Sequence, residues 1–255
     1  VEVIVVDQTP RCGRREDVYD RFPQDRVKVL YLDTAGQALA RNAGLKEVKT
    51  EWCFLFDDDS VPRGGMLKQH VDVIEHSHAD VSTGASLAPW KTDEHLAIEL
   101  RHFRQSDVLD TGNALAKVSS LMKIGGFDRA YDRGSGADND LGMRLYLSGG
   151  EIIFNPMAKR THFKAASGGL RTHGASWRER TGLWQPFPPP TQVYNVRRFY
   201  PKCARIPLHM LSFITARRRN NLPELAWLWL NAPWKLPLAI RRSDRLRTSV
   251  GQDKG

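Results

Sequence analysis

The sequence predicts an α/β fold with a mostly parallel central sheet flanked by helices, and three observations lead to that prediction. Short apolar runs alternate with amphipathic segments through the first part of the chain, which favours a parallel sheet covered on both faces. Carboxylates follow two of these runs, at Asp7 and at Asp57-Asp58-Asp59. Ligands bind beyond the carboxyl ends of the strands in such sheets, so both groups are expected at one rim.

The expected elements follow from their periodicity. Apolar runs of strand length occupy residues 1–6, 27–32, 52–56, 81–87 and 152–154. Residues 36–48 and 65–75 carry apolar side chains at helical spacing, such as Leu67, Val71 and Ile74 in the second segment. A further helix is expected to open at Asp138 and to end at Gly149-Gly150.

Composition bounds the class of protein. The 255 residues are 41% hydrophobic and include seven Trp, which is typical of a globular protein. Cys12, Cys53 and Cys203 form no CxxC pair, which excludes a disulfide framework and a cysteine zinc site and fits a reducing cytoplasm. No signal peptide is recognised, and no apolar stretch reaches the roughly 20 residues that span a bilayer.

The acidic cluster Asp57-Asp58-Asp59 ends the most apolar of the expected strands. Adjacent carboxylates repel one another unless a cation neutralises them, and oxygen ligands on a short loop suit Mg²⁺ or Mn²⁺. The cluster therefore predicts a divalent metal held against a diphosphate. The alternative is a plain turn or helix cap, because Asp is common in both.

Several segments, taken in order, resemble a family 2 glycosyltransferase of the GT-A fold over residues 1–171, about two thirds of the chain. The acidic cluster resembles the D-x-D motif of that family, and Asp138-Asn139-Asp140-Leu141 with Arg144 resembles the segment that carries its general base. The other matching segments are residues 4–7, Gly36 with residues 40–44, residues 125–128, and His162.

The resemblance implies a role for each matching residue. It implies that Asp138, at a helix start where the dipole favours an anion, is the general base. It implies a Mn²⁺ or Mg²⁺ ion on Asp59, with Asp57 and His162 as further ligands. The donor nucleotide is expected against Asp7, Arg41, Asp57 and Asp58. Outside the matching segments, Trp90 could offer a stacking face for a sugar, and Gly112 and Asn113, with Asp140, are assigned to the sugar or acceptor pocket.

Structural alternatives stand beside these roles. Asp138 could be only an N-cap, His162 a structural histidine, and Asp7 a strand-end turn. Arg41 could be a solvated helix charge and Trp90 a core residue. Asp140 could serve to fix the helix start or Arg144 instead of a ligand.

The chain departs from the family pattern in two places. Ala137 stands where the family usually has Glu before the base. The strand at residues 1–6 also corresponds to the second strand of the family fold, so the first strand, which forms part of the nucleotide pocket in relatives, is expected to be missing.

The C-terminal part carries the basic charge. Residues 185–255 contain 13 Lys and Arg against three Asp and Glu, whereas the remainder has 25 against 26. With the Pro-rich run at residues 185–190, this predicts a catalytic domain at residues 1–184 and a helical basic extension at residues 185–255. Residues 164–171, Gly- and Ser-rich and basic, are expected to form either a closing lid or an ordinary surface loop.

Trp interleaved with Arg in the extension resembles an interfacial membrane anchor, which would bind anionic lipid and place the protein peripherally at the inner face of the plasma membrane. A helical extension packed on the core or in a dimer is the alternative. No recognised nucleic-acid module occurs, so no nucleic-acid partner is expected.

The prediction is an inverting, metal-dependent glycosyltransferase. It would move a sugar from UDP or another nucleoside diphosphate to a glycan or a lipid-linked acceptor in surface polysaccharide assembly. One alternative is a metal-dependent phosphohydrolase or nucleotidyltransferase that uses the same acidic cluster. Another is a catalytically degenerate, glycan-binding scaffold, which Ala137 and the missing strand would favour.

Overall fold

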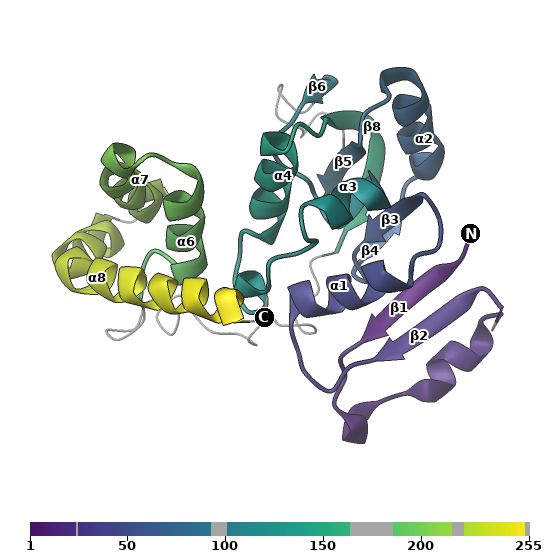
Figure 1. Cartoon of the computed structure of the whole chain (residues 1–255), viewed down its shortest axis with the longest axis horizontal. Coiled ribbons are helices and arrows are strands. Elements are labelled where there is room, and N and C mark those ends of the chain that lie inside the picture. Colours follow the sequence, from purple (N-terminus) through teal and green to yellow (C-terminus); the bar gives the residue numbers. More distant parts are fainter. Residues whose placement is uncertain (24, 93–100, 164–185, 216–221, 253–255) are drawn as a thin grey trace. The chain divides into compact units, whose positions relative to one another are not determined.

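A computed structural model describes residues 1–23, 25–92, 101–163, 186–215 and 222–252 (Figure 1). The chain divides into two compact units. The first comprises Val1–Asp128 with Ala137–Leu170, and the second comprises Arg129–Gly136 with Arg171–Gly255.

The first unit is built on a mixed sheet. Within the described residues its strands run in the order β3 (Trp52–Phe56), β7 (Asn113–Lys117), β5 (Val81–Leu87), β8 (Ile152–His162) and β4 (Ser60–Pro62). A short strand, β6 (Arg104–Gln105), pairs with β8 outside this path. The α/β class is as predicted.

The predicted parallel character of this sheet is wrong. Among these pairings only β5 with β8 is parallel, because β7 lies between β3 and β5 and runs antiparallel to both. The chain runs from β3 to β4 at the opposite edge and returns through the helix Met66–Ser77 to β5, which leaves one strand position between β3 and β5. A later segment of the chain fills that position in the opposite direction.

A second, two-stranded parallel sheet pairs β1 (Val3–Asp7) with β2 (Val27–Tyr31). Two short 3₁₀ helices, Arg11–Gly13 and Glu16–Arg21, connect these strands, and α1 (Gln37–Glu47) packs against β1. The two strands were predicted in one sheet with the others, but their hydrogen bonds join them to each other.

The alternation of side chains along β3 and β7 divides the core into two layers. Cys53, Ala114 and Ala116 face a cluster that includes residues of α1, of α3 (Val118–Lys123) and of α4 (Ala137–Leu147). Phe54 and Leu115 face the other way, where Ile74 of α2 (Met66–Ser77) packs. The sheet is thus covered on both faces, as expected.

The second unit is helical. It contains a 3₁₀ turn, Arg129–Tyr131, followed by α6 (Pro190–Phe199), α7 (Lys202–Thr215) and α8 (Leu222–Gln252). Helix α8 packs against α6, and the Tyr131 and Tyr194 rings meet edge to face at 5.7 Å. The predicted C-terminal helical extension is therefore present. Within the described part of the chain, the hydropathy of every helix falls short of what a membrane crossing requires.

Candidate active site

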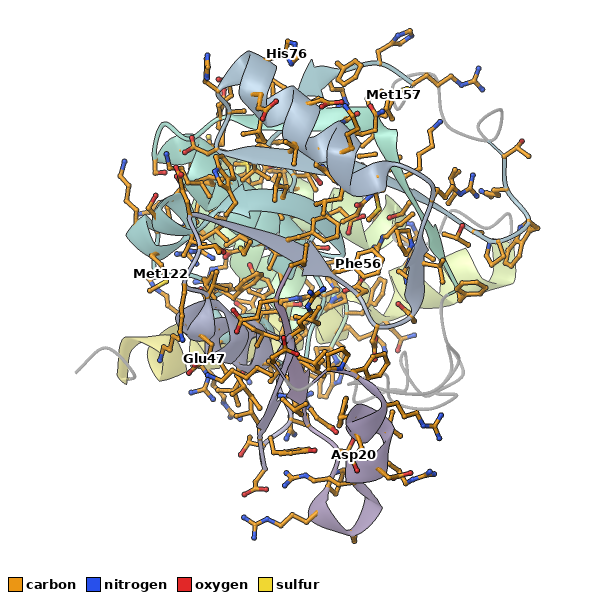
Figure 2. All side chains as sticks on the ribbon, turned by 90° about the vertical axis from the view of Figure 1, so that its right-hand side faces the viewer. Asp20, Glu47, Phe56, His76, Met122 and Met157 are labelled. Atoms are coloured by element: carbon orange, nitrogen blue, oxygen red, sulfur yellow. The ribbon has the colours of Figure 1, made fainter. Side chains whose placement is uncertain are left out.

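The predicted acidic cluster lies where β3 ends. Phe56, labelled in Figure 2, is the last residue of β3. Asp57, Asp58 and Asp59 follow it and lead directly into β4. The apolar run forms the predicted strand and is followed by the three carboxylates, but β3 is an edge strand of which only Cys53 is buried.

Strand pairing brings His162 to this cluster. Ser60 of β4 pairs with His162 of β8, and the Phe163 backbone N–H donates to the Asp59 carbonyl at 2.9 Å. His162 Nε2 consequently lies 3.2 Å from the Asp59 carboxylate, although the two residues are 103 positions apart. One ligand atom from each of Asp57, Asp59 and His162 falls within 4.8 Å of the others.

This donor set fits a divalent cation. Carboxylate oxygens and an imidazole nitrogen are ordinary ligands of such ions. The Asp59 side chain is 8% exposed and His162 is 20% exposed, so an ion between them would be partly shielded from water. Asp57 is the weaker ligand, because both of its oxygens already accept hydrogen bonds from guanidinium groups.

The first of these guanidinium groups belongs to Arg41 of α1. Its Nη2 lies 3.3 Å from Asp57 Oδ1, and its Nη1 lies 3.4 Å from Gln37 Oε1 one helical turn away. The Arg41 guanidinium also lies over the Phe127 ring at 5.7 Å. Arg41 is therefore held against Asp57 and is not a solvated helix charge, and its contact with the donor stays a prediction.

The second guanidinium group, Arg160, was missed in the sequence. Its side chain is only 3% exposed and donates to Asp57 at 2.8 Å and to Asp110 at 3.0 Å. The apolar run that predicts the last strand ends at Phe154, whereas β8 continues to His162. In the structure Ala158 and Arg160 are buried whereas Met157 and Lys159 are more exposed, an alternation that the residue types of this segment do not reveal.

Asp138 opens α4 and faces the same cluster. Its carboxylate accepts a short hydrogen bond from the Thr111 hydroxyl. Burial raises the pKa of Asp138, with the charges of Asp110 and Asp57 adding to the effect, while Thr111 and Arg41 oppose it. A carboxylate with a raised proton affinity is a candidate general base, and this role for Asp138 stays a prediction.

Tyr19 lies close to both Asp7 and Asp58. The Asp7 carboxylate accepts from the Thr9 backbone N–H at 2.8 Å and from the Tyr19 hydroxyl at 3.2 Å. Burial alone would raise the pKa of Asp7, but the bonds from Thr9 and Tyr19 and the charge of Arg14 outweigh it and lower the pKa. The charge of Asp58 also acts on Tyr19, so the two predicted donor residues share one region.

The structure gives two predicted pocket residues other positions. Asn113 is fully buried, and its amide bonds to the Ala85 and Ala158 carbonyls and to His70, so it does not line a sugar pocket. Asp140 is 1% exposed and pairs with Arg144 at 2.7 Å, which matches the structural alternative for this residue.

The remaining predictions have mixed outcomes. Gly112 is buried directly against Arg160 and Asp57. Trp90 is 75% exposed, so it is not a core residue, and its stacking role stays a prediction. The predicted lid at residues 164–171 lies outside the described residues.

Comparison with known sequences identifies relatives. Residues 1–125 match the model of the family described as Glycosyl transferase family 2. A pre-mycofactocin glycosyltransferase of Mycobacterium tuberculosis is 25% identical over 178 residues, which cover 64% of this chain and 37% of that protein. The chain thus spans well under half the length of the curated relatives that it matches.

Comparison with solved structures bears on the fold. S. aureus TarS 1–349 in complex with UDP-GlcNAc is 15% identical with a TM-score of 0.60, covering 96% of this chain and 74% of that one. The mannosyltransferase PcManGT from Pyrobaculum calidifontis, in complex with GDP-Man and Mn²⁺, is 20% identical with a TM-score of 0.55, covering 93% and 63%. These likenesses confirm the predicted GT-A fold.

Proposed function

We propose that this chain, whose residues 1–125 match the model of glycosyltransferase family 2 and whose fold is GT-A, transfers a sugar from a nucleoside diphosphate to an acceptor hydroxyl with inversion. The observation that carries the proposal is the meeting of two groups at one rim. Asp59 and His162 offer a metal site, and Asp138 offers a base, with Arg41 acting on both Asp57 and Asp138.

The chemistry assigns each residue one task. Asp138 accepts the proton of the acceptor hydroxyl as the new bond to the anomeric carbon forms and the bond from that carbon to the diphosphate oxygen breaks. Attack opposite the leaving group inverts the anomeric centre. Arg41 lies where its guanidinium can donate to the departing diphosphate, which suits a planar, permanently charged donor.

A divalent ion on Asp59 and His162, assisted by Asp57, would neutralise charge that develops on the leaving diphosphate. We propose Mn²⁺ over Mg²⁺, because His162 contributes a nitrogen and Mg²⁺ is bound chiefly through oxygen. The charges around the site also favour a cation. Asp57 pairs with Arg41 and Arg160, Asp110 pairs with Arg160, and Asp59 lies against His162, so carboxylates gather closely at this rim.

The direct test measures products. Purified protein is incubated with UDP- and GDP-sugars and Mn²⁺, and the released nucleotide is identified. Release of nucleoside diphosphate, stimulated by a sugar acceptor, supports transfer. Release of phosphate, pyrophosphate or nucleoside monophosphate would instead support the phosphohydrolase or nucleotidyltransferase alternative. Binding without turnover would support the glycan-binding scaffold.

We also propose that α8 contacts the inner face of the plasma membrane and brings the enzyme to a lipid-linked or glycan acceptor in surface polysaccharide assembly. Trp229, Leu230 and Trp234 of α8 are 45%, 81% and 56% exposed. Arg241, Arg242 and Arg245 are exposed on later turns of the same helix. An exposed aromatic and aliphatic face continued by arginines suits an anionic bilayer surface.

Vesicle sedimentation tests this contact. The full chain should sediment with vesicles that contain anionic lipid and less with zwitterionic ones. The pair Trp229→Ser and Leu230→Ser should weaken sedimentation. A matched pair on α4, Tyr146→Ser and Leu147→Ser, also replaces exposed apolar residues and should have no effect. Equal loss with both pairs would contradict the proposal.

A further inference from the structure

A buried arginine ties together the two halves of the candidate site. The Arg160 side chain is 3% exposed, and each of its nitrogens is used. Nε donates to Ser86 Oγ at 2.6 Å, and Nη1 donates to Asp57 Oδ2 and Ser60 Oγ, both at 2.8 Å. Nη2 donates to the two oxygens of Asp110 at 3.0 and 3.3 Å.

These contacts use the planar fork of a guanidinium group. A buried charge is costly unless it is paired and its remaining donors are satisfied, and here two carboxylates and two hydroxyls do both. A lysine ammonium is a point charge and could not span Asp57 and Asp110 in this geometry.

Asp110 extends the connection toward the base. Ser86 Oγ donates to Asp110 Oδ2 at 2.7 Å, and the Gly112 backbone N–H donates to Asp110 Oδ1 at 3.0 Å. Thr111 lies between Asp110 and Gly112 in the chain, and its hydroxyl donates a hydrogen bond to Asp138. Arg160 thus holds Asp57 on one side and, through the turn at residues 110–112, the residue that orients Asp138 on the other.

The packing leaves the guanidinium little freedom. A Cβ placed on Gly112 would lie 2.1 Å from both Arg160 Nη1 and Asp57 Oδ2. The backbone of this turn therefore lies directly against the ion pair. Movement of Arg160 would displace the turn that carries Thr111.

We propose that Arg160 is a positioning residue that fixes the donor-side carboxylate Asp57 and the base Asp138 in one arrangement. The inference rests on the proposed function. A buried ion pair is weak support for stability, since apolar residues of similar size often stabilise as well. The ion pairs of Arg160 with Asp57 and Asp110 instead keep the donor side of the site and the base at a fixed distance from each other. Misplacement of about 1 Å at a reacting centre costs about 10²-fold in rate.

The test is Arg160→Lys, with Arg104→Lys as the matched control. Arg104 of β6 lies over Phe154 of β8, so the same replacement is made on a neighbour of the same strand but away from the site. Arg160→Lys should lower kcat for release of nucleoside diphosphate by about 10²-fold while the donor KM changes by less than about threefold. Arg104→Lys should leave both unchanged.

A double-mutant cycle separates positioning from general loss of structure. Thr111→Val removes the hydroxyl that bonds to Asp138, and should cost less in kcat when Arg160 is already Lys. If the fold-losses in kcat of Thr111→Val and Arg160→Lys multiply in the double variant, Arg160 does not act through the turn, and the proposal is overturned. If Arg160→Lys fails to fold, Asp110→Asn, which keeps the side-chain shape but removes its charge, must show the same fall in kcat with a retained donor KM.

The two proposals fail in different ways. If the wild-type protein releases no nucleoside diphosphate from any donor, the proposed function is wrong and the positioning role falls with it. If the wild type is active and Arg160→Lys behaves as Arg104→Lys does, only the positioning role is wrong.

Discussion

Replacing Asp138 by Asn should abolish transfer while stabilising the fold. The amide oxygen of Asn can still accept from the Thr111 hydroxyl, so the start of α4 should keep its conformation. The proton of the acceptor hydroxyl then has no carboxylate to receive it. Loss of a general base lowers kcat by about 10²–10⁴-fold. Donor binding should be retained, because Arg41, Asp59 and His162 are unchanged.

The effect on stability follows from the raised pKa of Asp138. Because the folded-state pKa lies above the ordinary value of 3.8, the folded protein binds this proton more tightly than the unfolded chain does. The ionised carboxylate therefore destabilises the fold increasingly as pH rises from 3.8 through the folded value, and the cost persists at neutral pH. Each tenfold gain in proton affinity corresponds to about 1.4 kcal/mol. Asp138→Asn removes this cost.

Two assays check the prediction together. Transfer is followed by release of nucleoside diphosphate, and thermal unfolding is compared between pH 3.5 and 7.5. The melting temperature of Asp138→Asn should exceed that of the wild type at the higher pH and converge with it at the lower one. Asp72→Asn, on the exposed part of α2, is the control for losing one carboxylate. Transfer within tenfold of wild type in Asp138→Asn would refute the assignment of the base.

Three further predictions concern other parts of the first unit. His162→Ala should weaken Mn²⁺-dependent nucleotide binding, measured by calorimetry, and leave metal-free binding unchanged; a loss of both would contradict a metal role. Asn42→Ala should destabilise the fold by about 1–3 kcal/mol, measured by urea unfolding, because Asn42 makes two hydrogen bonds of 2.8 Å to the Phe127 backbone. The pKa of Asp7 is lowered, so its contribution to stability is present above pH 3.8 and is lost as pH falls below that value. Asp7→Asn should therefore lower the melting temperature at pH 7 but hardly at pH 3, and an equal loss at both would contradict the charge-based explanation.

The strand that leads into the candidate site is visible in the sequence, because an apolar run that ends in polar residues marks a strand end. The apolar run before Asp57 became β3 with the predicted bounds, and the cluster followed it at the rim. Strand direction is not encoded in the same way. The segment at residues 113–117 is short and consists mostly of small apolar residues. Nothing in its pattern therefore indicates an antiparallel strand between β3 and β5.

The missed arginine has a local cause. Asn155-Pro156 resembles a turn, and Pro is disfavoured within a central strand. In the structure the pairing of β5 with β8 shifts register between Gly84 and Ala85, opposite this segment, and β8 continues beyond it. The Asn155 side chain accepts from the Met157 backbone N–H at 2.9 Å, which supports the irregularity. Arg160 reaches the site because β8 continues beyond Pro156.

Asn113 was predicted to lie in the sugar pocket, and the structure buries its side chain elsewhere. Its neighbours Thr111 and Gly112 do reach the site, and Asn113 was assigned to the same pocket as Gly112. Side chains alternate along a strand, and Asn113 is the first residue of β7. Its amide therefore faces the interior, where it satisfies His70 and two backbone carbonyls.

The most direct test of the central claim is a thermal-shift panel of nucleoside diphosphates with and without Mn²⁺. A ligand present at 100 times its dissociation constant stabilises the fold by about 2.7 kcal/mol. A metal-dependent nucleotide-sugar transferase predicts that one nucleotide raises the melting temperature with Mn²⁺ present, and that Asp59→Ala abolishes this shift. An identical shift in Asp59→Ala, or none with any nucleotide, would contradict the account.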